Sequence, residues 1–298
     1  MAELQKLLTE QVNPASASID ALSTEEALRI INAEDRKVAD AVALEIPNIA
    51  RAVDAIVDAL QQGGRLFYIG AGTSGRLGVL DASECAPTFS VPTEIVQGIM
   101  AGGESALSRP TEANEDDPAM GARDLLARGF SGADILVGLA ASGRTPYVLG
   151  AVDAAKAAGA VTVGISCTPD SDLARAADIA ITPLPGPEVV AGSTRMKAGT
   201  AQKLVLNMLT TCTFIRMGYV YGNLMVNVQP KNTKLVDRAR RIVAQAAGVS
   251  YERAGELLHA AGDSVRTAIV MSRAGVSRGE AERRLAATGG RVAKALNG

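Results

Sequence analysis

The sequence predicts an α/β fold, in which a parallel sheet is flanked by helices, with N-terminal helices and a small C-terminal helical subdomain. Short apolar runs alternate with helical patterns between residues 64 and 182. This alternation is typical of parallel sheets. After about residue 220 only helical patterns remain. We therefore expect an N-terminal helical segment (1–55), an α/β domain (56–219) and the helical subdomain (220–298).

Two helices are expected before the sheet. Ser23-Thr24-Glu25-Glu26 offers a capping box for a long amphipathic helix, with Pro47 marking a break. A second helix is expected over residues 48–60, because the Gly63-Gly64 pair that follows is typical of a helix end. We interpret this part of the chain as helical packing or as a dimer surface.

The remaining elements follow from apolar runs and turn residues. The expected strands are 66–69, 94–100, 134–140, 161–165 and 178–182. The expected helices are one from near Gly75, then 119–128, 146–158, 171–177, a buried helix over 204–217, 232–247, 250–261, 263–273 and 277–288. Ligands bind at the carboxyl ends of the strands in such sheets, so the loops there are candidate sites.

The first candidate loop reads Gly70-Ala71-Gly72-Thr73-Ser74-Gly75. Backbone N–H groups at the following helix, with the hydroxyls of Thr73 and Ser74, favour an anion such as a phosphate ester. A dinucleotide site would need an acidic residue at the end of the next strand, which is missing. A nucleotide P-loop would need Lys and Ser/Thr where Arg76-Leu77 stands. A simple tight turn stays an alternative.

Two further loops carry hydroxyl groups at predicted helix starts. Ala141-Ser142-Gly143-Arg144-Thr145 repeats the Ser-Gly-Arg of the first loop, and Pro146 suits the first position of the next helix. The third loop is Gly192-Ser193-Thr194-Arg195-Met196-Lys197. A second anion-binding turn is the simplest interpretation of the repeat, and the third loop has the same character.

Composition is consistent with a compact cytoplasmic enzyme. The chain has 298 residues, 47% of them hydrophobic, and Lys+Arg 30 nearly balances Asp+Glu 32. This balance and the 3% aromatic content argue against a nucleic-acid partner. The N-terminal residues lack the pattern of a secretion signal, and no segment has the length and apolarity of a membrane span.

Cysteine and histidine are sparse. Cys85, Cys167 and Cys212 are far apart and His259 is the single histidine, so we expect no disulfide framework, no metal site and no cofactor. Acid–base chemistry then falls to carboxylates. His259 lies in an apolar helical pattern, which favours a packing role.

In their order and combination the three loops, with Asp81-Ala82-Ser83-Glu84-Cys85, resemble the N-acetylmuramic acid 6-phosphate etherase family. The resemblance extends over nearly the whole chain, with Ala86-Pro87 where the family has two prolines. It implies a SIS-type, flavodoxin-like sandwich similar to the glucokinase regulatory protein. It also implies a homodimer that acts in bacterial cell-wall recycling without metal or cofactor.

The resemblance further implies elimination of D-lactate from C3 of the sugar, followed by addition of water. Glu84 is then the acid that protonates the departing lactate oxygen and the base that activates water, and Glu115 is the base at C2. Glu112 and Asp116 are alternatives in the same acidic loop. The three hydroxyl-bearing loops predict the substrate-binding residues Thr73, Ser74, Ser142, Gly143, Thr145, Ser193 and Thr194.

Two other functions stay open. A non-catalytic sugar-phosphate sensor would need the hydroxyl loops but not the paired carboxylates, so Glu84 and Glu115 argue for an enzyme. An aldose–ketose isomerase on the same fold would also remove a C2 proton. Release of D-lactate distinguishes the etherase from both.

Overall fold

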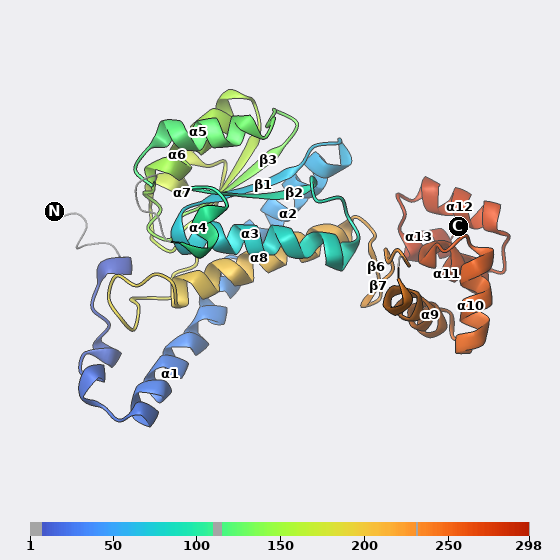
Figure 1. Cartoon of the computed structure of the whole chain (residues 1–298), viewed down its shortest axis with the longest axis horizontal. Coiled ribbons are helices and arrows are strands. Elements are labelled where there is room, and N and C mark those ends of the chain that lie inside the picture. The colour runs from blue at the N-terminus through green and yellow to red at the C-terminus, as the bar shows by residue number, and fades with distance from the viewer. Residues whose placement is uncertain (1–7, 110–114, 231, 298) are drawn as a thin grey trace. The chain divides into compact units, whose positions relative to one another are not determined.

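The computed structural model describes residues 8–109, 115–230 and 232–297. They form two compact units: Met1–Glu84 with Thr93–Thr210, and Cys85–Pro92 with Thr211–Gly298. Figure 1 shows the chain coloured from its N-terminus to its C-terminus. The first unit contains the sheet and all three hydroxyl-bearing loops, and the second contains the C-terminal helices.

The first unit is built on a five-stranded parallel sheet, which confirms the predicted fold class. The strands are β1 (Leu66–Gly70), β2 (Val96–Met100), β3 (Ile135–Leu139), β4 (Val161–Ile165) and β5 (Ile179–Ile181), in the order β2-β1-β3-β4-β5. Gly70 pairs with both Met100 and Leu139, so these strands end at one level. The strand order reverses between β1 and β3, and ligands bind at such a switch point in open α/β sheets.

Helices cover both faces of this sheet because its central strands are buried and almost wholly apolar. Figure 1 shows α5 and α6 on one face and α3 and α8 on the other. The helices are α2 (Ile46–Gln61), α3 (Gly72–Phe89), α4 (Ser105–Ser108), α5 (Pro118–Ala127), α6 (Pro146–Ala157), α7 (Asp172–Ala176) and α8 (Lys197–Arg216). Pro146 is at the start of α6 as predicted. In contrast, α3 begins at Gly72 and not near Gly75, so the prediction of its start was wrong.

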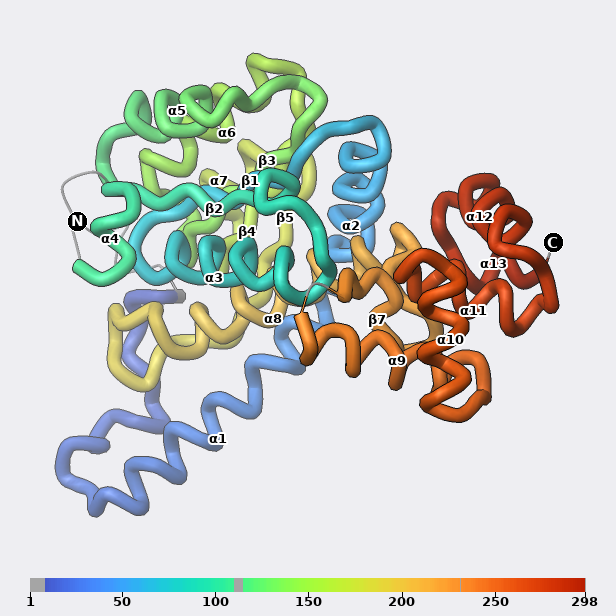
Figure 2. Tube along the Cα trace, turned by 45° about the vertical axis from the view of Figure 1, so that its right-hand side comes forward, coloured from blue at the N-terminus to red at the C-terminus, as the bar shows by residue number. Residues whose placement is uncertain are grey.

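The N-terminal part of this unit consists of short 3₁₀ turns and the long helix α1 (Thr24–Ala43). Ser23 and Glu26 form the predicted capping box through both of its hydrogen bonds. The break predicted at Pro47 lies just before it, at residues 44–45, and Pro47 itself is in the first turn of α2. Figure 2 shows that α1 extends away from the sheet, and its buried residues are only Glu34, Val38 and Val42.

In its described residues, the second unit contains the ends of α3 and α8, a two-stranded hairpin and five complete helices, with a separate apolar core. Its elements are β6 (Val220–Tyr221), β7 (Leu224–Met225), α9 (Thr233–Ala247), α10 (Tyr251–Ala260), α11 (Val265–Ala274), α12 (Arg278–Ala287) and α13 (Val292–Leu296). The hairpin and α13 were not predicted. His259 is exposed at the end of α10, so its predicted packing role was wrong. Among the described residues, every helix is too short or too polar to cross a bilayer.

Candidate active site at the carboxyl edge of the sheet

The turn from β1 into α3 requires its glycines. A Cβ atom added to Gly70 would lie 2.7 Å from the backbone nitrogen of Gly75, and one added to Gly75 would lie 2.5 Å from the carbonyl oxygen of Gly70. Only glycine allows the strand end and the helix to approach so closely. Thr73 and Ser74 consequently lie in the first turn of α3, directly above the end of β1.

The first turn of α3 packs against α8. The buried Ser74 hydroxyl donates to Oε1 of Gln202 at 2.9 Å. One turn earlier on α8, a Cβ added to Gly199 would lie 3.4 Å from the Thr73 methyl group. Gln202 was not singled out as a site residue from the sequence, because a glutamine in a helical pattern carries no signal of its own.

The turn from β3 into α6 also depends on a glycine. Gly143 has φ +67°, and a Cβ atom there would lie 2.3 Å from Oγ of Ser171. The Ser142 hydroxyl oxygen accepts from the backbone N–H of Arg144, and its proton is not donated to any residue that the structure describes. Thr145 is buried and directly precedes α6. Gly143 therefore shapes the turn that presents the hydroxyl groups of Ser142 and Thr145.

The structure brings Glu115 to this second turn. The Thr145 hydroxyl donates to Oε1 of Glu115 at 3.3 Å, and the backbone carbonyl of Glu115 accepts from Tyr147 at 3.0 Å. Of the two alternatives, Asp116 is exposed and Glu112 lies outside the described residues. Glu115 is thus the carboxylate of the acidic loop that the described structure places beside a predicted substrate-binding residue.

The third loop lies directly before α8 and presents hydroxyl groups. The first backbone N–H groups of α8 are already hydrogen-bonded within the protein. The Glu188 carboxylate accepts from the backbone nitrogens of Lys197 and Ala198 at 2.9 and 3.0 Å. Ser193 and Thr194 are half-buried in the same loop. A phosphate here would have to use these hydroxyls, because Glu188 already occupies the positive end of the helix.

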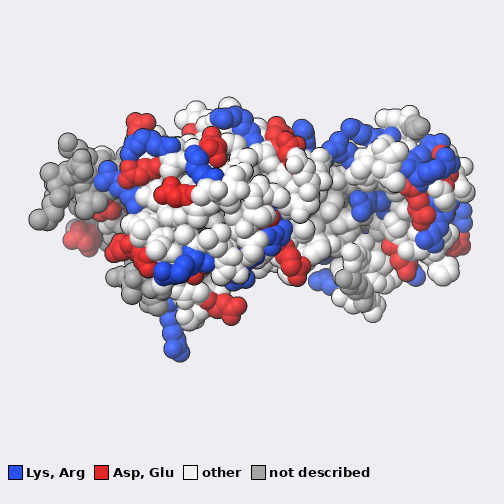
Figure 3. Space-filling model, turned by 90° about the horizontal axis from the view of Figure 1, so that it is seen from above, with Lys and Arg blue, Asp and Glu red and all other residues white. Residues whose placement is uncertain are grey.

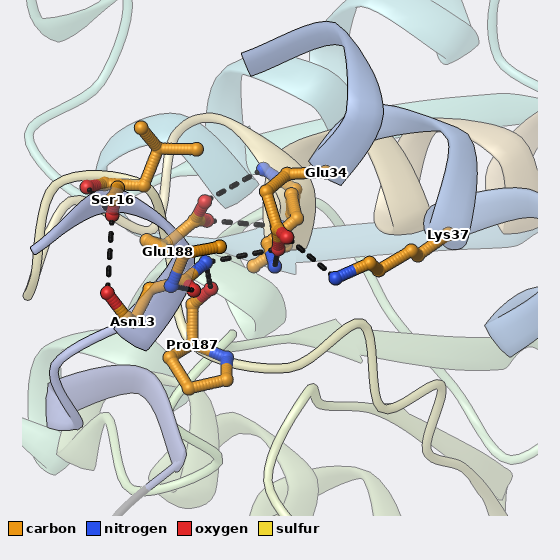
Figure 4. Close-up of polar contacts among 10 residues, drawn as sticks. Asn13, Ser16, Glu34, Lys37, Pro187 and Glu188 are labelled. Atoms are coloured by element: carbon orange, nitrogen blue, oxygen red, sulfur yellow. Dashed lines mark hydrogen bonds and ion pairs between the residues drawn. The ribbon is translucent and has the colours of Figure 1, made fainter. Parts of the chain in front are cut away.

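The third loop is held by the N-terminal part of the chain. Figure 4 shows Asn13 and Ser16 from the N-terminal turns beside Glu34 of α1 and Pro187 of the loop. Asn13 donates to the carbonyl of Pro187 at 3.1 Å, and Ser16 donates to that of Val189 at 2.7 Å. These contacts join segments more than 170 positions apart in the sequence.

A buried ion pair completes this attachment. Nζ of Lys197 lies 2.6 Å from Oε2 of Glu34, and both side chains are almost wholly buried. Burial raises the pKa of the Glu34 carboxyl, but hydrogen bonds from two lysines and Asn13 outweigh it and lower the pKa to about 2. Glu34 therefore stays ionised at neutral pH, and its contact with Lys197 fixes the start of α8.

Replacing Lys197 by Met is expected to lower the free energy of unfolding by about 3–5 kcal/mol, because Glu34 keeps a buried charge without its main partner. The measurement is urea denaturation at pH 7. Lys37→Met is the control, since Lys37 also pairs with Glu34 but is largely exposed, and should cost below about 1 kcal/mol.

The same pair predicts a pH dependence. The lowered pKa of Glu34 contributes stability that is present above its unfolded value of 4.5 and is lost as the pH falls through about 2. The difference between the native protein and Lys197→Met should therefore shrink on acidification from pH 4.5 towards 2. A difference that stayed constant would show that the pair does not contribute as an ion pair.

Glu84 is not brought to this edge of the sheet within one chain. It is exposed on α3, eleven positions after Thr73, which corresponds to about 16 Å along the helix axis. Asp81, one turn before it, accepts from Tyr68 at 3.0 Å and from Asn207 of α8 at 2.7 Å. These buried bonds hold this part of α3 in place, and burial raises the pKa of Asp81. Glu84 and Glu115 are thus separated.

Two arginines of the Ser-Gly-Arg repeats have structural contacts. Arg76 donates to the backbone carbonyls of Ala106 and Leu107, which attaches α4 to α3. Arg144 lies 4.0 Å from the carboxylate of Asp172 at α7. Both arginines therefore have contacts within the protein itself.

The described surface also has a cavity of about 820 Å³ beside β2. Val79, Met100, Met120 and Asp124 are among its lining residues, and none of the predicted site residues lines it.

On the face shown in Figure 3, Lys/Arg and Asp/Glu side chains are interspersed. Among the described residues no three His, Cys, Asp or Glu side chains cluster as metal ligands. The hydroxyl-bearing loops carry the predicted site residues, and they are kept as the candidate site.

Comparison with known families agrees with this geometry. The family model for the glucokinase regulatory protein N-terminal SIS domain matches residues 48–156, and that for the SIS domain matches residues 123–212. Together they span the sheet, the turns after β1 and β3, and most of α8. The fold and the family models define a SIS-domain protein.

Curated relatives define the family more closely. Proteins named N-acetylmuramic acid 6-phosphate etherase from Vibrio vulnificus (strain YJ016) and Mesorhizobium japonicum are 53% and 52% identical to this chain. The alignments cover 99% and 100% of this chain and 98% and 97% of the relatives. The chain belongs to the N-acetylmuramic acid 6-phosphate etherase family.

Among solved structures, the chain is similar to phosphoheptose isomerase from Neisseria gonorrhoeae, with 18% sequence identity and a TM-score of 0.49. The match covers 64% of this chain and 99% of the isomerase chain.

Proposed function

We propose that this protein cleaves the D-lactyl ether of N-acetylmuramic acid 6-phosphate, giving N-acetylglucosamine 6-phosphate and D-lactate. The reaction would take place in the cytoplasm, during recycling of bacterial cell-wall amino sugars. Family membership over nearly the full length is the observation that carries the proposal. The position of Glu115 beside Thr145, at the switch point of the sheet, supports it.

The proposed chemistry explains why carboxylates and hydroxyls suffice. A simple alkyl ether resists hydrolysis, but ring opening exposes an aldehyde at C1, and the C2 proton then becomes removable because the anion is delocalised. Glu115 takes this proton, and Glu84 protonates the lactate oxygen as the C3–O bond breaks. Glu84 then deprotonates a water molecule that adds at C3, and the proton on Glu115 returns to C2.

The phosphate is held mainly by neutral donors in this proposal. Ser142 is suited to this role because its hydroxyl accepts one hydrogen bond and donates none among the described residues. The other proposed contacts are Thr73, Ser74, Thr145, Ser193 and Thr194, which lie on the three hydroxyl-bearing loops. Ser74 and Thr145 would contact the phosphate through their backbone N–H groups, because their hydroxyl protons are donated to Gln202 and Glu115. Neutral donors of this kind allow the phosphate to bind without a metal.

A second copy of the chain would supply the missing acid. Glu84 lies eleven positions after Thr73 on α3, whereas Glu115 bonds to Thr145 at the carboxyl edge of the sheet, so the two carboxylates are separated in one chain. We propose a homodimer in which the partner's Glu84 completes the site that holds Glu115.

Incubation with N-acetylmuramic acid 6-phosphate is expected to release D-lactate and N-acetylglucosamine 6-phosphate in equal amounts, as measured by a D-lactate dehydrogenase assay and by mass spectrometry. Unphosphorylated N-acetylmuramic acid is the control and should be a much poorer substrate. Formation of a ketose phosphate without lactate would identify an isomerase. Binding without turnover would identify a sensor.

A further inference from the structure

Gln202 is a buried polar residue to which the sequence analysis assigned no role. Its side chain lies on α8 and is 1% exposed. Its Oε1 atom accepts from the Ser74 hydroxyl at 2.9 Å, whereas its Nε2 atom has no hydrogen-bond partner among the described residues. A buried amide nitrogen with two unused N–H groups is costly, so it calls for a specific explanation.

The position of this amide points to a ligand site. Nε2 is bonded to the same carbon as Oε1, so it also lies at the first turn of α3, directly beside Ser74. Gly199, one turn before Gln202 on α8, packs against Thr73 of the same turn. The free amide therefore lies among the residues proposed to bind the phosphate.

Near Ser74, the side-chain amide of Gln202 is the group that can donate a hydrogen bond to an anion. Ser74 has a single hydroxyl proton, which it donates to Gln202 and cannot donate to an anion at the same time. The first two backbone N–H groups of α8 are bonded to Glu188. The two N–H groups of the Gln202 amide are uncommitted in the described structure.

We infer that Gln202 is a substrate-binding residue, whose amide donates to a phosphate oxygen while its carbonyl group fixes Ser74. This inference rests on the proposed function, because it assigns a further contact to the same phosphate subsite. A carboxylate at this position would repel the phosphate, and an apolar side chain would neither bind it nor hold Ser74. The requirement is thus for an amide.

Binding of N-acetylglucosamine 6-phosphate, measured by calorimetry, tests the inference. Gln202→Met should weaken this binding roughly 10- to 100-fold, the range for loss of a buried hydrogen-bond donor. Gln202→Glu should weaken it further, because it places two negative charges together. In turnover, KM should rise more than kcat falls.

Thr213→Val is the matched control. Thr213 is also on α8, is 1% exposed and has a hydroxyl without a partner among the described residues. This variant should bind N-acetylglucosamine 6-phosphate as tightly as the native protein does.

A measurement on the unmodified protein guards against misfolding of the variants. Gln202 is the buried glutamine of the described residues, so its isotope-labelled side-chain amide should exchange slowly with solvent in NMR. Adding N-acetylglucosamine 6-phosphate should shift this amide, and N-acetylglucosamine should not. The inference would be overturned if folded Gln202→Met bound N-acetylglucosamine 6-phosphate with native affinity, or if the amide signal did not shift on adding this sugar phosphate. Either result would indicate that the amide donates to a bound water instead. Phosphate binding without lactate release would refute the proposed function and leave this inference standing.

Discussion

Glu115→Gln should stop both lactate release and exchange of the C2 proton with solvent deuterium. Glu115 is proposed to remove that proton, and every later step depends on the resulting anion. The loss of activity should reach roughly 10²- to 10⁴-fold, the range for a positioned general base. The Thr145 hydroxyl can still meet the amide oxygen of the variant, so the turn should keep its structure.

Glu84→Gln should lower lactate release by a similar factor but retain C2 exchange, because the acid acts after the proton has gone. The measurement is deuterium at C2 of recovered substrate by NMR, alongside lactate production. Asp116→Asn is the control, since this neighbouring carboxylate is exposed. Exchange in Glu115→Gln but not in Glu84→Gln would reverse the two roles. Near-normal lactate release by both variants would remove both residues from the mechanism.

Co-expression of Glu84→Gln with Glu115→Gln is expected to restore activity that neither variant has alone. If the partner's Glu84 completes each site, a mixed dimer contains one site with both carboxylates and one site with neither. Random pairing should then give on the order of a quarter of native activity. Tagging the two variants differently allows the mixed dimer to be purified and assayed.

The double variant Glu84→Gln/Glu115→Gln, paired with the native chain, is the matched control. If the two subunits share each site, every site of this mixed dimer has glutamine in place of one of its two carboxylates, and the dimer should be inactive. If each chain uses its own two carboxylates, the native chain should stay active, and the co-expressed single variants should not recover. That result would contradict the shared site and require α3 to move, although Asp81 holds it against β1 and α8.

Much of the fold could be predicted because it depends on short-range patterns. The capping box at Ser23 and the proline at the start of α6 were correctly placed, since both act within one helical turn. The start of α3 was predicted wrongly because glycine disfavours a helix in isolation. In the folded chain Gly75 lies in that helix because only glycine fits against Gly70.

The sequence by itself determined the α/β class, the family, and the turns that carry Ser74, Ser142 and Ser193. Only the tertiary structure decided which side chains meet. Ser74 bonds to Gln202 across 128 positions, and Lys197 pairs with Glu34 across 163. It also separated Glu84 from Glu115. Local propensities act over a few residues, whereas these contacts depend on the path of the whole chain around the sheet.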